Sequence, residues 1–220
     1  MNYSTRQNNS VTLTGTITTS PQFSHELYGE KFFEIMLSVK RLSTASDMLP
    51  VCFSERLAPM DFFEVGKDIT VYGQFRSYNK LVDDHSKLML CVFVKEVTLA
   101  NETVNPNAIE LSGYICKPPV FRTTPFGREI CDLLLAVNRA YNKSDYVPCI
   151  AWGRNARFVS GLPVGEAISI SGRVQSRQYQ KKVSETETLT KTAYEVSVSK
   201  VALGTTTKTT SELYAEALNQ

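Results

Sequence analysis

The chain has 220 residues, enough for one large domain or two small ones, and its 42% hydrophobic residues, 21% charged residues and net charge of +2 are typical of a folded protein. No apolar run approaches the roughly 18 residues of a membrane-spanning helix, and the start MNYSTRQNNS lacks the apolar core of a signal peptide. The five cysteines are scattered without a CxxC pair and only two histidines occur, so we expect no metal, no cofactor and no disulfide framework.

The first half of the chain reads as short strands. Residues 11–17 (VTLTGTI) alternate apolar with small or polar side chains, which is the period of a half-buried strand. A glycine turn at Gly29 precedes a longer apolar strand. In chain order we then expect strands at Phe32–Val39 and Leu49–Phe53, a short helix at Glu55–Phe63, and strands at 68–75 and 88–94.

The second half repeats this order at a spacing of 98 residues. Shifted by that amount the two halves align without a gap from Val11 to Ala58, with matches that include Gly15 with Gly113, Arg41 with Arg139 and Asp47 with Asp145. The equivalent elements are Ile130–Val137 (strand), Val147–Trp152 (strand), Arg154–Ser160 (helix), 167–174 (strand) and 194–201 (strand). We therefore predict two homologous domains at 11–100 and 108–203, a linker at 101–107 and a tail at 204–220.

Three strands, a short helix and two strands in about 95 residues are the layout of an OB-fold, a five-stranded Greek-key barrel. The predicted fold class is therefore all-β, with two consecutive OB-fold barrels that each carry one short helix. Gly15 and Gly113 lie in the middle of a strand, where a missing side chain permits the bend that a small barrel needs. The alternative is another small β-barrel or a β-sandwich.

Charge is distributed unevenly between the copies. Residues 11–100 carry nine Lys/Arg against eleven Asp/Glu, whereas residues 117–182 carry eleven against four. A polyanionic ligand would therefore bind mainly to the second copy.

Three segments of the second copy are specific: AVNR before a loop, CIAWGRNA at the junction from strand to helix, and GRVQSRQY at the entry to the last hairpin. Over Ile109–Tyr179 this copy resembles the bacterial single-stranded-DNA-binding protein family, which includes PriB-like members. In this chain the resemblance implies a tandem OB-fold form. The first copy keeps LSVKR and VGKDITVYGQFRS but reads VCFSE where the second reads CIAWG.

The resemblance implies sequence-tolerant binding of single-stranded DNA, in which bases stack on aromatic side chains and a basic groove follows the phosphates. The family's aromatic positions hold Tyr141, Tyr146, Trp152 and Tyr179. Phosphate contacts are expected from the basic side chains of the same copy, which are Arg122, Arg128, Arg139, Arg154, Arg173, Arg177, Lys181 and Lys182.

The first copy lacks aromatic residues at those four positions, which hold Ser43, Met48, Ser54 and Lys80, with Phe53 and Tyr78 nearby. Two roles stay open for it. It binds DNA weakly through its basic residues Arg41, Arg56, Arg76 and Lys80, or it acts mostly as a built-in partner for the second copy.

The ending SELYAEALNQ predicts a short Ser-capped helix in place of the family's acidic tail, so recruitment of other proteins through such a tail is doubtful. The family commonly assembles four barrels, which predicts a homodimer, and replication, recombination or repair proteins are possible partners. The expected location is the cytoplasm, at the nucleoid, with no membrane partner.

Other functions remain open. The barrel surface of a primosomal or conjugation accessory factor would mainly dock another protein, and an RNA-binding or purely structural barrel is a further possibility. Neither a P-loop, nor paired carboxylates, nor a Ser-His-Asp set is evident, so we expect no catalytic residues and no enzyme.

Overall fold

The structure is a computed structural model that describes residues 8–82, 85–100, 106–182 and 188–204; for Val82, Lys181 and Lys182 it describes the backbone only. The elements of the first copy are β1 (Asn9–Ile17), β2 (Gln22–Leu27), β3 (Glu30–Lys40), β4 (Ser46–Ser54), the 3-10 turn η1 (Met60–Phe63), β5 (Asp68–Val82) and β6 (His85–Leu99). Those of the second copy are β7 (Asn107–Ile115), β8 (Val120–Thr123), β9 (Glu129–Arg139), β10 (Lys143–Trp152), α1 (Arg154–Ser160), β11 (Ala167–Lys182) and β12 (Thr188–Leu203).

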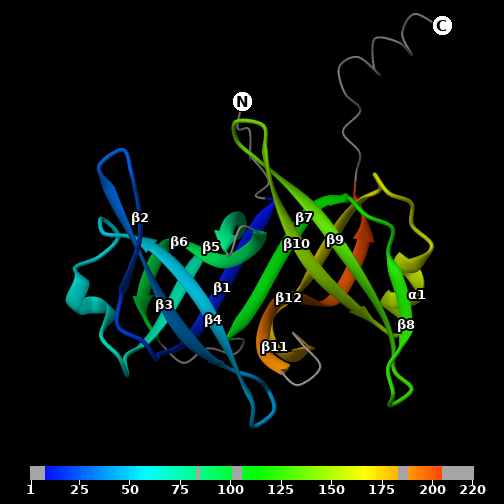
Figure 1. Ribbon diagram of the computed structural model, residues 1–220, viewed down its shortest axis with the longest axis horizontal. Coiled ribbons are helices and arrows are strands. Elements are labelled where there is room, and N and C mark those ends of the chain that lie inside the picture. Colours follow the sequence, from blue (N-terminus) through cyan, green and yellow to red (C-terminus); the bar gives the residue numbers. More distant parts are fainter. Residues whose placement is uncertain (1–7, 83–84, 101–105, 183–187, 205–220) are drawn as a thin grey trace, which may run out of the picture.

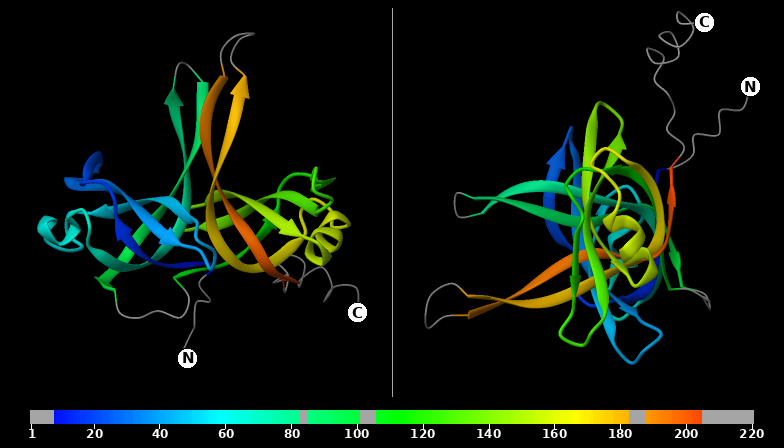
Figure 2. Two further views of the ribbon diagram at one scale, coloured as in Figure 1. Left: turned by 90° about the horizontal axis from the view of Figure 1, so that it is seen from below. Right: turned by 90° about the vertical axis from the view of Figure 1, so that its right-hand side faces the viewer.

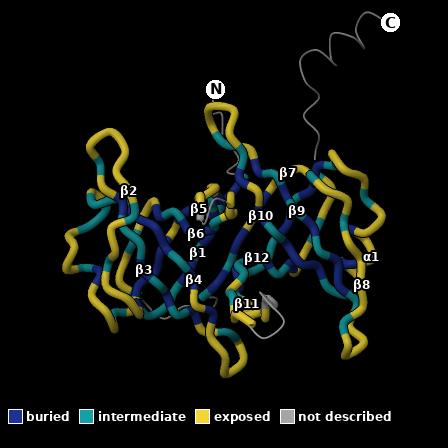
Figure 3. The backbone as a smooth tube through the Cα atoms, in the orientation of Figure 1, coloured by how far each residue is buried: buried dark blue, intermediate teal, exposed yellow. Residues whose placement is uncertain are grey.

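In the strands of each copy, buried side chains alternate with side chains that point to solvent. In β7, residues 109, 111, 113 and 115 are buried, while the residues between them point to solvent. The buried positions of all the long strands meet inside the two barrels, and exposed residues gather in the loops and hairpin tips (Figure 3). The fold class, two consecutive OB-fold barrels in an all-β chain, is confirmed.

Each barrel closes where its first strand changes partner. Strand β1 pairs with β5 from Val11 to Thr16 and with β3 at Thr16 and Ile17, and β7 pairs with β11 and β9 in the same way. A Cβ at Gly15 would lie 2.3 Å from the carbonyl oxygen of Ser38, and one at Gly113 would lie 2.3 Å from that of Ala136. Glycine is therefore required at both crossings, because the backbones approach too closely for any side chain.

Two features differ from the expected layout. Each copy has an additional strand, β2 or β8, which pairs antiparallel with the strand that follows it. In the first copy the expected helix over Glu55–Phe63 is reduced to the 3-10 turn η1, preceded by Pro59 in an extended conformation with ψ 146°. Proline disfavours helical geometry in the residue before it, which ends a helix here, whereas the second copy has no proline in α1.

The two copies join edge to edge through β1 and β7. These strands pair antiparallel from Asn9 opposite Leu111 to Leu13 opposite Asn107. The result is one sheet of twelve strands that runs through both barrels, with β1 and β7 at its centre (Figure 1). Because the same strand joins each barrel to the other, the copies are related by an approximate twofold axis.

Two long hairpins extend beyond the barrels. They are formed by β5 with β6 and by β11 with β12, and both project from the same side of the molecule (Figure 2). The helix expected in the C-terminal tail lies outside the described residues. Among the described helices, none is long and apolar enough to cross a membrane.

Candidate nucleic-acid interface

The outer face of β10, β12 and β11 carries the first group of predicted residues. Trp152 ends β10, and its indole N–H donates a hydrogen bond to the Ser197 hydroxyl on β12 at 3.2 Å. It lines an open cleft with Arg154 and Phe158 of the adjoining helix α1. The hydrogen bond fixes one edge of the indole ring, so the ring is held at the surface at a defined angle.

Strand β11 presents Arg173, Arg177 and Tyr179 at alternate positions, which places them on one face of the sheet. The Arg177 guanidinium lies 6.0 Å from the centre of the Tyr179 ring, a cation–π contact. Arg177 also pairs with Glu195 on the neighbouring strand at 3.3 Å. An aromatic ring and a cation therefore lie side by side at the base of the hairpin.

Four of the predicted phosphate-binding arginines are already in ion pairs with carboxylates on other strands. These pairs are Arg122 with Asp132, Arg139 with Asp145, Arg173 with Asp47, and Arg177 with Glu195. The number of unpaired cationic side chains at the surface is therefore smaller than the charge count of the sequence indicates. Arg128 and Arg154 are exposed, and the side chains of Lys181 and Lys182 lie outside the described part of the chain.

Tyr141 and Tyr146 lie nearer to the first copy than Trp152 does. Tyr141 is in the turn between β9 and β10, has a φ of 60° and is 94% exposed. Tyr146 lies on β10, six residues before Trp152, and its backbone N–H donates to the Ser77 hydroxyl of the first copy at 2.7 Å. Six residues of strand span about 20 Å, so the four predicted aromatic residues form a track along the surface and not one cluster.

The first copy has an aromatic groove that the sequence alignment missed. Its cleft of about 640 Å³ is lined by side chains from β2, β3, β5 and β6, which include Phe23, His25, Phe32, Arg76, Tyr78 and Phe93. These residues lie outside the four family positions, so aligning those positions could not find them. The detectable signal was alternation, since residues 89, 91 and 93 of β6 line the groove while residues 90, 92 and 94 belong to the barrel core.

Several rings of this groove are already stacked. His25 lies over Phe32 with centroids 4.7 Å apart, and the Arg76 guanidinium lies 3.9 Å from the centre of the Phe93 ring. Burial, together with nearby Glu34, raises the pKa of Tyr78, whose hydroxyl donates to that carboxylate at 3.4 Å. In contrast, Phe53, which the sequence placed near a family position, is fully buried against Phe63 in the core.

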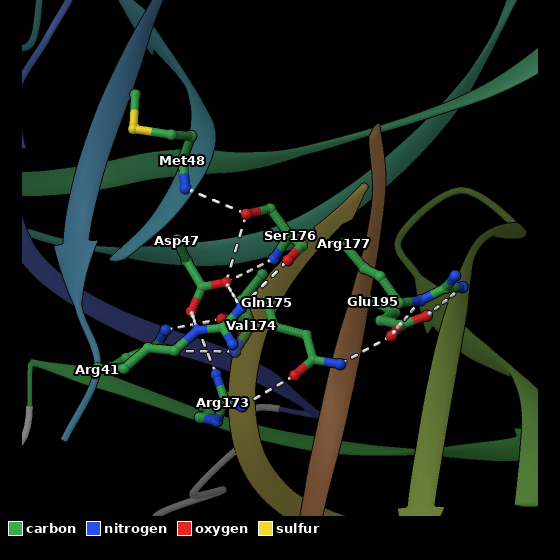
Figure 4. A network of polar contacts seen from close by, with 10 residues as sticks. Arg41, Asp47, Met48, Arg173, Val174, Gln175, Ser176, Arg177 and Glu195 are labelled. Carbon is green, nitrogen blue, oxygen red and sulfur yellow. Dashed lines mark hydrogen bonds and ion pairs between the residues drawn. The ribbon is translucent and has the colours of Figure 1, made fainter. Parts of the chain in front are cut away.

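Hydrogen bonds of the Asp47 side chain link the two copies beside these surfaces (Figure 4). Its carboxylate is fully buried and accepts hydrogen bonds from the guanidiniums of Arg41 and Arg173 and from the backbone N–H of Ser176. The hydrogen bond to Asp47 raises the pKa of Arg41, whereas burial and the neighbouring Arg41 lower that of Arg173. One carboxylate thus serves two cations that come from different copies.

The twofold equivalent, Asp145, is less well satisfied. Its Oδ1 accepts from the backbone N–H of Ser77 at 2.8 Å and lies 3.4 Å from Arg139, while the buried Oδ2 has no hydrogen-bond partner. Asp145 lacks a second arginine because an arginine and a glutamine stand in the opposite order in the two copies. The second copy reads Arg173 and Gln175, but the equivalent positions of the first read Gln74 and Arg76.

The fold and these surfaces define a tandem OB-fold protein with aromatic and basic residues on the barrel faces. Comparison with known families gives a closer identification. Residues 106–203 match the model of the single-strand binding protein family. This match covers the second copy and agrees with the resemblance that its sequence predicted.

Curated relatives agree with this assignment. The chain is 34% identical over 83 residues to the single-stranded DNA-binding protein of Clostridium tetani, which covers 34% of this chain and 57% of that protein. It is 33% identical over 81 residues to single-stranded DNA-binding protein A of Bacillus subtilis, which covers 34% of this chain and 47% of that protein. The chain thus spans about half the length of the curated relatives it matches.

A solved structure covers both copies. The single-stranded DNA binding protein from Thermus aquaticus aligns with 90% of this chain and 93% of its own chain, with a TM-score of 0.70 and 22% identity. At that identity the likeness establishes the shared tandem fold.

Proposed function

We propose that this protein binds single-stranded DNA with little sequence preference, by stacking bases on aromatic side chains beside a basic groove. The observation that carries the proposal is that the copy matching the family model is also the copy that places Trp152, Arg177 and Tyr179 on one face. Flat rings accept any base, and neighbouring guanidiniums neutralise the phosphates, which together give tolerant binding to a single strand.

The roles of individual residues are part of this proposal. Trp152 and Tyr179 stack bases on the sheet face, and Tyr146 and Tyr141 continue the track toward the first copy. The exposed cations Arg128 and Arg154 contact phosphates directly. Arg122 and Arg177 do so while sharing their charge with carboxylates, so their contribution is smaller.

The experiment is a binding titration with fluorescently labelled oligo-dT, oligo-rU and duplex DNA at two salt concentrations. Oligo-dT is expected to bind most tightly, and its affinity should fall steeply as salt rises because phosphates release counterions. Equal affinity for duplex DNA, or no measurable affinity for oligo-dT, would contradict the proposal. Tighter binding of oligo-rU would favour an RNA-binding barrel.

Two copies supply two of the four barrels that such proteins commonly assemble, so we propose that the chain forms a homodimer. Light scattering is expected to give twice the chain mass of 24.6 kDa, and a monomer at micromolar concentration would contradict it. We further propose that the protein has no catalytic activity and acts at the nucleoid in replication, recombination or repair. The accessory-factor alternative is not favoured, because the curated relatives are named for DNA binding.

A further inference from the structure

Two clefts of the molecule adjoin one another. The aromatic groove of the first copy and a second cleft of about 690 Å³ at the junction between the copies share the side chains of Leu27, Arg76 and Arg139. The junction cleft adds Tyr141 and Lys143, which belong to the β9–β10 hairpin of the second copy. A surface path therefore runs from the groove of one barrel onto the hairpin of the other.

The two arginines in the shared part of this path are only weakly paired with carboxylates. Arg76 makes hydrogen bonds to the neutral amide of Gln74 and a cation–π contact to Phe93, but among the described residues it makes no ion pair. Arg139 touches Asp145 through a single nitrogen at 3.4 Å. Burial and the nearby Arg139 lower the pKa of Arg76, so each guanidinium raises the electrostatic energy of the other.

The other junction is different. There Arg41 and Arg173 both bond directly to Asp47, so both guanidiniums are engaged by a carboxylate within the protein. The reversed order of Gln74 and Arg76 removes the second arginine from Asp145 and turns it toward the groove. The acidic side chain of the groove, Glu34, lines only the first cleft and is held by the hydroxyls of Ser24 and Tyr78.

We propose that Arg76 and Arg139 form a phosphate bridge over which one single strand passes from the groove of the first copy to the Tyr141 hairpin of the second. Guanidiniums suit this role, since their planar fork matches two phosphate oxygens. Lys143 supplies a third cation beyond the bridge, and Tyr141, 94% exposed, offers a ring for the next base. This inference rests on the proposed function and makes the first copy part of the binding surface.

The test compares Arg76→Gln with wild type on two lengths of oligo-dT. Glutamine fits this position, because the second copy carries Gln175 at the equivalent place. An oligonucleotide of about 8 nucleotides is held by one barrel, and one of about 30 reaches across both, since a single OB-fold occupies roughly 4–16 nucleotides. Lys143→Gln is the second variant, on an exposed side chain whose loss is expected to leave the fold intact. Lys67→Gln, beside Glu64 and away from both clefts, is the matched charge control.

With the long oligonucleotide we expect Arg76→Gln to weaken binding about fivefold or more. The slope of log affinity against log salt should become shallower by about 0.7 for each phosphate that the protein no longer neutralises. Lys143→Gln should act in the same direction, while the short oligonucleotide, held by the second copy, changes less than about twofold. Unchanged affinity for the long oligonucleotide in both variants, or an equal loss with Lys67→Gln, overturns the bridge. Wild-type binding of oligo-dT would then still support the proposed function.

Discussion

The Oδ1 atom of Asp47 in the first copy accepts a hydrogen bond from the backbone N–H of Ser176 in the second at 2.8 Å. The same bond joins Asp145 to Ser77 in the opposite direction, also at 2.8 Å. Both aspartates are fully buried, yet the atoms around them differ, since Asp47 holds two arginines and Asp145 leaves one oxygen without a partner. The two halves of a nearly symmetric junction therefore contribute unequally to stability.

We predict that Asp47→Asn lowers the free energy of unfolding by about 1.5–3 kcal/mol, because charge-assisted hydrogen bonds to two arginines are lost. Asp145→Asn should cost less than about 1 kcal/mol, since its Oδ2 forms no hydrogen bond in the wild type. Urea unfolding of both variants measures the difference. An equal cost for the two would show that the unpartnered oxygen has no energetic consequence.

A dependence of stability on pH follows from Asp145. Burial raises its pKa above the usual value, against the opposing effects of the Ser77 N–H and of Arg139. The folded state therefore holds this proton more tightly than the unfolded state, so the contribution of Asp145 to stability falls as pH rises through its raised pKa. Comparing the wild type with Asp145→Asn from about pH 4 upward isolates this effect, and the difference in stability between them should change with pH. Parallel curves would contradict it.

Trp152 is the only tryptophan, so its fluorescence reports on the sheet face of the second copy. We predict that oligo-dT quenches this emission and that Trp152→Ala weakens binding by about 1–3 kcal/mol, the usual value for one stacked base. Tyr72→Ala, on an exposed aromatic residue that lines none of the clefts described above, should bind as wild type does. Unchanged emission at saturation would place the indole away from the DNA.

The crossing glycines give a prediction about folding. Gly15→Ala and Gly113→Ala each force a Cβ to 2.3 Å from a carbonyl oxygen, so each should lower the melting temperature markedly, with a cost of about 2 kcal/mol or more. Gly161→Ala is the control, because its φ is −90° and its nearest neighbour lies 3.9 Å away. Thermal unfolding followed by circular dichroism makes the comparison. A control as destabilised as the two variants would exclude the steric explanation.

The sequence by itself determined the duplication, the all-β class and the resemblance of the second copy to the single-strand binding protein family. These features depend on local information, namely the spacing of Gly15 and Gly113, the alternation in strands such as residues 109–115, and the segment that ends in Trp152. Helix α1 over Arg154–Ser160 was equally local, whereas Pro59 shortened the expected helix of the first copy to a single 3-10 turn.

Only the tertiary structure decided which charges face solvent and where the aromatic groove of the first copy lies. Arg173, for which the sequence predicts a phosphate contact, reaches across the junction to Asp47, 126 residues away in the chain. Phe93 and Arg76 come together because β5 and β6 pair in register, and Phe23 joins them from a strand that was not expected. Such contacts depend on which strands become neighbours, and the pairing of distant strands leaves no periodic trace in the residues that make it.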